Sequence, residues 1–164
     1  MENFLTLGGN PTHDAFGTIA IRLLVAAVLG ALIGLEREVK KHSAGLRTHM
    51  LVSTAAATFT IMTFEIYHEM VDLNADNIAR LDPIRVIEAV TAGVAFLAAG
   101  AIIRSGTDIK GLTTGAGLWM AGAIGVAAGA GFFSVAVMAT VLVLVITVAL
   151  RPFEKRFLEK KDDL

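Results

Sequence analysis

The ionisable residues of this chain concentrate at residues 34–49, flanked by stretches at 23–35 and 50–64 that carry no charge. Charges of both signs beside apolar stretches are costly near lipid unless they face water, one another or a bound ion. The segment is therefore the first candidate for chemistry. We expect a polar site built from its members and from two threonines further along the chain: Glu36, Arg37, Arg47, Thr48, His49, Thr113 and Thr114.

The first part of this segment also has a structural interpretation. Glu36 and Lys40 are one helical turn apart and can pair. We interpret Glu38, Lys40 and Lys41 as a solvated helix end, where lysines mark the cytoplasmic side of a membrane. For Glu36 and Arg37, which adjoin the apolar stretch directly, the functional and the solvated interpretations both stay open.

The second part of the segment and a glycine-rich stretch complete the expected site. Arg47 can extend to lipid headgroups. His49 can titrate or bind a metal, although a hydrogen-bonded structural histidine is the more common case. Thr113 and Thr114 lie in the glycine-rich residues 111–117. We expect the glycines of the helices, among them Gly30, Gly117 and Gly129, to allow close helix packing. For residues 111–117 the alternative is that they expose backbone oxygen to an ion or substrate.

A second polar group is expected at the opposite membrane face. Asp82, Arg85 and Glu88 follow one another at a spacing of three, which places them on neighbouring faces of one helix. Asp82 before a proline predicts a helix N-cap. Arg22 lies inside an apolar stretch and needs a partner, and we expect Glu88 or Asp82 to provide it. A purely structural ion-pair cluster is the alternative for this group.

Composition excludes several classes of function. The 164 residues are 55% hydrophobic and 18% charged, and they include no cysteine. Thiol catalysis and thiolate metal sites are therefore excluded, and the net charge of −1 gives no indication of nucleic-acid binding. No nucleophile with a paired base stands out, because Ser53 among its neighbouring threonines is typical of interhelical hydrogen bonding. We expect a protein that is not an enzyme.

Five apolar stretches predict an all-α polytopic membrane bundle, since a membrane helix needs about 20 apolar residues. We expect transmembrane helices at 15–35, 46–67, 84–103, 112–128 and 132–150, preceded by an N-terminal segment at 1–14 and followed by a tail at 151–164. Lysine and arginine collect after the first and third helices and in the tail. Basic loops favour the cytoplasm, so we predict an N-terminus outside and a C-terminus inside.

Five segments resemble the MgtC/SapB family of bacterial inner-membrane proteins. They are 30–38 (GALIGLERE), 44–49 (AGLRTH), 82–85 (DPIR), 96–100 (FLAAG) and 111–119 (GLTTGAGLW). The chain resembles a short member, without the soluble C-terminal domain of longer members. The resemblance implies a multi-pass inner-membrane protein, often dimeric. Its residue pattern covers both expected polar groups except Arg22 and Glu88, and it adds Trp119.

The resemblance also implies a function. The family is linked to magnesium-related cation homeostasis, to virulence in pathogens, and to control of membrane potential or the ATP synthase. A transporter or channel for Mg²⁺ or another small ion and a structural dimeric interaction module stay open as alternatives. The implied partners are the lipid bilayer, a second copy and another membrane protein complex, and no nucleic acid is expected.

The residues themselves bear on the identity of the ion. Glu36, Asp82 and Glu88 offer the hard oxygen ligands that Mg²⁺ prefers, but the predicted topology places Glu36 at the opposite face from the other two. The group at 36–49 carries net positive charge, which suits an anion, a lipid headgroup or a partner's carboxylate better than a lone Mg²⁺. No cofactor is assigned, and the metal-ligand set stays open.

Overall fold

The computed structural model describes residues 12–72, 82, 84–105 and 107–150. Its elements are α1 (Phe16–Val39), α2 (Leu46–Asp72), α3 (Ile84–Ala101), β1 (Ile103–Ser105), β2 (Asp108–Lys110), α4 (Leu112–Gly129), α5 (Phe133–Leu144) and the π-helical turn η2 (Val145–Ala149). Helices α1 to α4 are long and apolar enough to cross a membrane, and α5 with η2 is a shorter apolar helix. The predicted all-α membrane bundle is confirmed. The side on which each end lies stays a prediction, and residues 1–11 and the tail at 151–164 lie outside the described residues.

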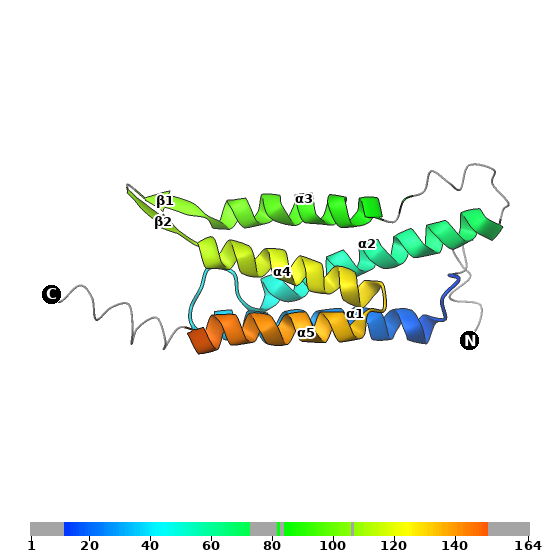
Figure 1. Cartoon of the computed structure of the whole chain (residues 1–164), viewed down its shortest axis with the longest axis horizontal. Helices are drawn as coiled ribbons and strands as arrows, with labels where there is room; N and C mark the ends of the chain where they lie inside the picture. The colour runs from blue at the N-terminus through cyan, green and yellow to red at the C-terminus, as the bar shows by residue number, and fades with distance from the viewer. Residues whose placement is uncertain (1–11, 73–81, 83, 106, 151–164) are drawn as a thin grey trace.

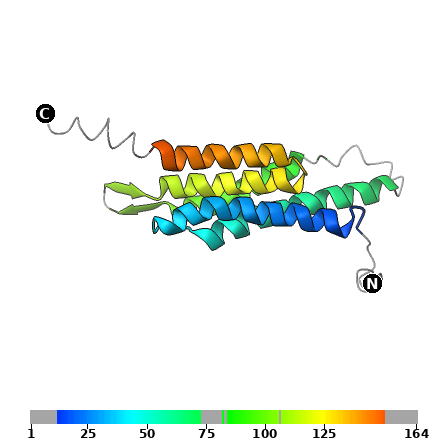
Figure 2. The ribbon, with the colours of Figure 1, turned by 90° about the horizontal axis from the view of Figure 1, so that it is seen from below.

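The connection between α3 and α4 differs from the expected helix, because α3 ends at Ala101 and a short antiparallel hairpin follows. The β-branched Ile103 pairs with Lys110 in this hairpin. Gly111 then returns the chain into α4 with a φ of +90°, and a Cβ there would collide with the carbonyl oxygen of Ala101. The hairpin projects beyond the helices at one end of the molecule (Figures 1 and 2). We name this the hairpin end and the opposite one the N-terminal end.

Helix α4 is the centre of the bundle. It packs against α1, α2, α3 and α5, whereas α3 lies along the outside of α4 (Figure 1). Of the apolar span of α4, 56% is buried, compared with 6% for α3. A helix that is apolar all round is suited to such a central position.

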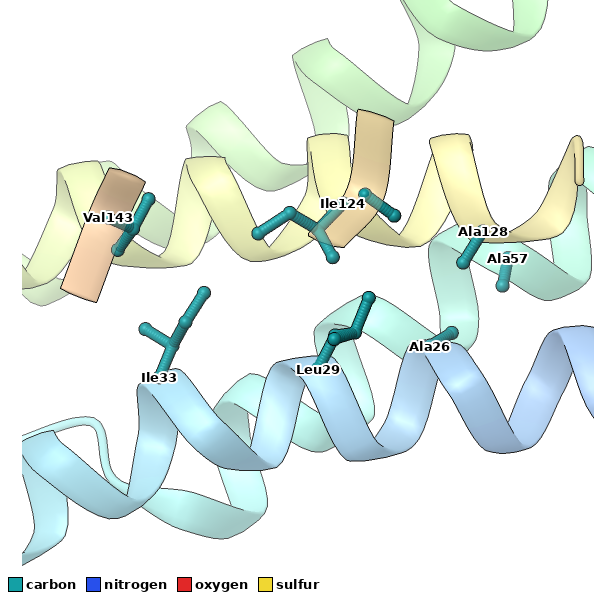
Figure 3. Packing of buried hydrophobic residues seen from close by; sticks show 8 residues of the cluster. Ala26, Leu29, Ile33, Ala57, Ile124, Ala128 and Val143 are labelled. Carbon is teal, nitrogen blue, oxygen red and sulfur yellow. The ribbon is translucent and has the colours of Figure 1, made fainter. Parts of the chain in front are cut away.

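Aliphatic side chains fill the space between α1, α4 and α5 (Figure 3). The buried cluster consists of Ala26, Leu29, Ile33, Ala57, Ile124, Ala128, Ala136 and Val143. Glycines bring the backbones together around it: a Cβ on Gly30 would lie 2.7 Å from the carbonyl oxygen of His49, and one on Gly129 would lie 2.6 Å from that of Ala57. These contacts confirm the expected packing role of the glycines.

Candidate functional site at the hairpin end

The site begins with a buried arginine at the end of α1. Arg37 is 3% exposed, and its Nη2 donates to the hydroxyl of Thr114, also buried, over 2.9 Å. Helix α1 continues past the apolar stretch to Val39, so Arg37 still lies within the helix. Its guanidinium contacts the first turn of α4. A buried charge requires partners, so Arg37 is a fixed part of the interior and not a solvated helix end.

Glu36 and Lys40 form the predicted ion pair one helical turn apart. Lys40 is not the solvated residue that the sequence suggested, because its Nζ also donates to the carbonyl oxygen of Thr147 over 3.3 Å. Thr147 belongs to the π-helical turn η2, whose i→i+5 hydrogen bonding departs from the α-helical pattern. Such turns are rare and frequently mark functional sites. The hydroxyl of Thr147 bonds back to the carbonyl of Val143 over 2.9 Å.

These groups border a cleft of about 310 Å³ between α1, the start of α4 and η2. Its polar lining includes Glu36, Arg37, Lys40, His42, Thr113 and Thr147, and its apolar lining consists of Ile146 and Leu150. The first turn of α4 has no side-chain cap. Its leading N–H groups have no intrahelical acceptor and carry the positive end of the helix dipole. The cleft therefore combines two cationic side chains and a helix N-terminus with one carboxylate.

The other expected members of the site lie elsewhere. Arg47 and Thr48 are exposed on the first turn of α2 and do not line the cleft. His49 is fully buried, with its Nδ1 2.8 Å from the carbonyl oxygen of Gly45. Its Nε2 faces α4, where a Cβ on Gly117 would lie 3.2 Å away. The structural interpretation of His49 is therefore supported, and its position is explained by helix packing.

Glu38 and Ser53 both differ from what the sequence indicated. Glu38 is exposed, yet its carboxylate accepts the backbone N–H of Leu46 over 2.9 Å and so caps the start of α2. Ser53 is buried, and within the described residues its hydroxyl has no hydrogen-bond partner. The nearby Thr58 and Thr60 bond to carbonyls four residues earlier in their own helix, so the expected interhelical bonding is not found for these three residues.

The expected second polar group is not brought together at the N-terminal end. Arg22 pairs with Asp14 over 2.7 Å and with neither Asp82 nor Glu88, because α3 lies on the far side of α4 from α1. Asp82 caps α3 as predicted, its Oδ1 accepting the N–H of Ile84 over 2.9 Å. Arg85 and Glu88 are exposed on α3, and no described residue forms an ion pair with either.

Two further contacts tie the chain together at the N-terminal end. The carboxylate of Glu65 on α2 accepts the backbone N–H groups of His13 and Asp14, at 2.5 and 3.1 Å. The imidazoles of His13 and His68 stack with their centroids 4.1 Å apart. More than 50 residues separate the bonded partners, so no local pattern in the sequence could have indicated them.

The ionisable groups at the two ends are separated by the aliphatic cluster between α1, α4 and α5 (Figure 3). Glu36 lies at the hairpin end, far from Asp82 and Glu88 at and near the start of α3. Within the described residues, no group of three or more His, Cys, Asp or Glu side chains could hold a metal ion. The three carboxylates therefore do not combine into one magnesium site.

Comparison with known proteins identifies the family of this chain. The model of the MgtC family matches residues 23–156, which include helices α2 to α5 and most of α1. This chain belongs to the MgtC family. It is a membrane protein, with the charged α1–α2 connection and the α4 N-terminus inside the matched region. No solved structure matches it.

Three relatives show how far the similarity extends. An uncharacterised protein of Haemophilus influenzae is 39% identical over 98% of this chain and 67% of its own length. The protein MgtC of Salmonella typhimurium is 38% identical over 83% of this chain and 54% of its own length. The protein MgtC of Brucella abortus is 39% identical over 77% and 49%. The chain thus spans about half the length of the relatives that bear the name MgtC.

Proposed function

We propose that this chain acts in magnesium-linked cation homeostasis as a regulatory membrane module that does not itself conduct ions. The observation that carries the proposal is the separation of the charged groups by the aliphatic cluster in the middle of the bundle. Ion pathways through membranes are lined by polar or ionisable groups that face a water-filled cavity. The aliphatic cluster offers Leu29, Ile33 and Ile124 instead.

The hairpin end is the part of the molecule through which such a module would act. It combines the charged cleft with the exposed Arg47 and Thr48 at the start of α2. Exposed charged groups next to a membrane suit docking to another membrane protein complex. Control of membrane potential or of the ATP synthase is the finer form of the proposal.

Reconstitution into liposomes tests the non-conducting part. A vesicle loaded with a magnesium indicator and exposed to a Mg²⁺ gradient should show the same flux with the protein as without it. Repeating the measurement with Ca²⁺, Na⁺ and proton gradients covers the other ions. Flux above the protein-free level under any gradient would contradict the proposal and support a transporter.

Growth of a deletion strain at limiting magnesium tests the homeostatic part. The wild-type chain should restore growth and the signal of a potential-sensitive dye, and Arg37→Ala should not. Lys41→Ala is the matched control, because Lys41 is exposed and does not line the cleft. Equal growth of all strains at every magnesium level would remove the link to magnesium.

We further propose that the chain lies in the bacterial inner membrane with its hairpin end in the cytoplasm. The chain has no cysteine, so single substitutions report sidedness without background. In intact cells, an impermeant maleimide should label Asp72→Cys at the N-terminal end and leave Ser43→Cys unlabelled until the cells are lysed. The reverse pattern would invert the topology.

A second candidate function is self-association through α3, with a second copy as the occupant. The outward face of α3 carries the charged Arg85 and Glu88, and Gly93 and Gly100 have nothing within 4 Å of the positions of a Cβ. Small residues allow close helix approach in lipid, and charges near lipid need partners. Two parallel α3 helices related by a two-fold axis bring Arg85 of each copy within about one turn of Glu88 of the other.

A charge exchange tests this interface. Glu88→Arg should lower the dimer fraction in single-molecule photobleaching, and the double variant Arg85→Glu, Glu88→Arg should restore it. Asp72→Arg is the control, because it reverses the charge of an exposed acidic residue on α2 as Glu88→Arg does on α3. Failure of the double variant to recover the dimer would show that the two charges do not meet across the interface.

A further inference from the structure

We propose that the cleft at the hairpin end binds a phosphate group that carries a hydrogen-bond donor beside it, as a lipid headgroup or free hydrogen phosphate does. This inference is independent of the proposed role in magnesium homeostasis, because it concerns binding alone. The cleft measures about 310 Å³, at the small end of the range of about 300–1,000 Å³ typical of small-molecule sites.

The cationic side of the cleft supplies the groups that recognise phosphate. Arg37 and Lys40 both line it, and charge-assisted hydrogen bonds from such groups to phosphate are the strong ones. The uncapped first turn of α4 brings Thr113 to the same cleft. Helix N-termini favour anions through their N–H groups and dipole. The cationic side chains and the N-terminus of α4 therefore both favour the binding of an anion.

Glu36 explains why the ligand needs a donor as well as a negative charge. Its side chain is only 10% exposed, and it lines the cleft. Both carboxylate oxygens are buried: Oε1 pairs with the Lys40 ammonium, and within the described residues Oε2 accepts no hydrogen bond. A buried acceptor left without a donor is costly. A hydroxyl or protonated oxygen next to the bound phosphate would satisfy it.

The apolar lining suggests how a lipid would enter. Ile146 and Leu150 border the cleft, and both are about half exposed. An acyl chain could lie along them while the headgroup reaches Arg37 and Lys40. Free hydrogen phosphate would use the polar lining alone. The two sources share the same chemistry, and the experiment separates them.

Lipid retention tests the first source. Detergent-solubilised protein is incubated with phosphatidylglycerol, whose glycerol hydroxyls are donors, and bound lipid is counted by native mass spectrometry. Lys40→Met should weaken retention by about tenfold, since the loss of one charge-assisted hydrogen bond is worth about 1.5 kcal/mol or more. Lys41→Met removes the same charge one residue away, outside the cleft, and should retain the lipid as the wild type does.

Inorganic phosphate, added to detergent-solubilised protein without lipid, tests free hydrogen phosphate as the source. Millimolar phosphate should raise the unfolding midpoint of the wild type and of Lys41→Met but not of Lys40→Met if the site takes the free ion. Stabilisation by phosphatidylglycerol alone would identify the lipid as the source. The absence of a difference between Lys40→Met and Lys41→Met with both probes would overturn the proposal.

Glu36→Ala tests the donor requirement. It should weaken retention of phosphatidylglycerol severalfold and leave phosphatidylmethanol, whose headgroup has no donor, retained as well as or better than by the wild type. Equal weakening of both lipids would contradict the role of the carboxylate. Because Lys40 loses its partner in this variant, Glu36→Gln serves as a second variant that keeps an acceptor oxygen and should retain phosphatidylglycerol.

Discussion

Helices α3 and α4 have the same length of 18 residues and are both apolar and rich in small residues, yet they occupy opposite environments. Ten residues of α4 are buried; Gly125 and Gly129 lie against the backbone of α2, and Gly115 lies against that of α3. In α3 only Val94 and Ala98 are buried, while Gly93 and Gly100 face open space. The difference shows that small residues allow close packing but do not select which helix becomes the centre.

The largest expected effect comes from filling a glycine contact of α4. A Cβ on Gly125 would overlap the carbonyl oxygen of Ser53 and lie 2.8 Å from the Cβ of Ala56. Because backbone cannot give way as a side chain can, we expect Gly125→Leu to yield no folded protein in fluorescence-detected size-exclusion chromatography. Gly93→Leu on α3 should elute as folded protein. Normal folding of the Gly125 variant would show that α4 can move away from α2.

A smaller difference is expected for truncated aliphatic side chains. Ile124 on α4 is fully buried, whereas Leu97 on α3 is 53% exposed. Ile124→Ala should lower the free energy of unfolding by about 2–5 kcal/mol, because it leaves a cavity in the aliphatic cluster. Leu97→Ala should change it by at most about 0.5 kcal/mol, as expected for exposed positions. Denaturant titration in micelles measures both, and equal losses would place α3 in the core as well.

The hydrogen bond between Thr114 of α4 and Arg37 should contribute less to the free energy of unfolding than the apolar core of α4 does. Thr114→Val removes the acceptor for Arg37 Nη2 while keeping the volume of the side chain. We expect a loss of about 1.5–3 kcal/mol, the range for hydrogen bonds to charged groups. Thr91→Val on the half-buried flank of α3 is the control and should stay within about 0.5 kcal/mol. The same titration compares the two, and an unchanged Thr114 variant would mean that Arg37 is held by its other contacts.

The smallest effect concerns the attachment of α3 itself. Val94 packs on Gly122 of α4, where a Cβ would lie 2.9 Å from one Val94 methyl group. Val94→Ala should cost about 1 kcal/mol, since it removes two methyl groups from a thinly covered helix. Hydrogen exchange should accelerate in α3 and stay unchanged in α1 and α4. Acceleration throughout the bundle would show that α3 stabilises the whole fold.

Much of the fold followed from local patterns in the sequence. The apolar stretches predicted five helices, the spacing of Glu36 and Lys40 predicted their ion pair, and Asp82 before a proline predicted the cap of α3. The hairpin at 103–110 was not predicted, because its residues are too few to establish a strand pattern.

The candidate site was only partly predictable. Glu36, Arg37, Thr113 and Thr114 were expected at one polar site and do lie together. Arg47 and Thr48 were expected there as well but point to the surface, and Lys40 was assigned to solvent although it lines the cleft. The direction of a side chain at a helix end depends on the neighbouring helix, which the local sequence does not specify.

The sequence by itself determined which segments are helical and which residues carry charge, because hydrophobic periods and caps act within a few residues of the chain. Only the tertiary structure decided which partners the charged side chains find beyond their own helix. Arg37 reaches Thr114 across 77 positions, Lys40 reaches Thr147 across 107, and Arg22 pairs with Asp14 instead of a residue of α3. The first two contacts depend on how α4 and η2 pack against α1, and the third depends on the position of α3 across α4 from α1.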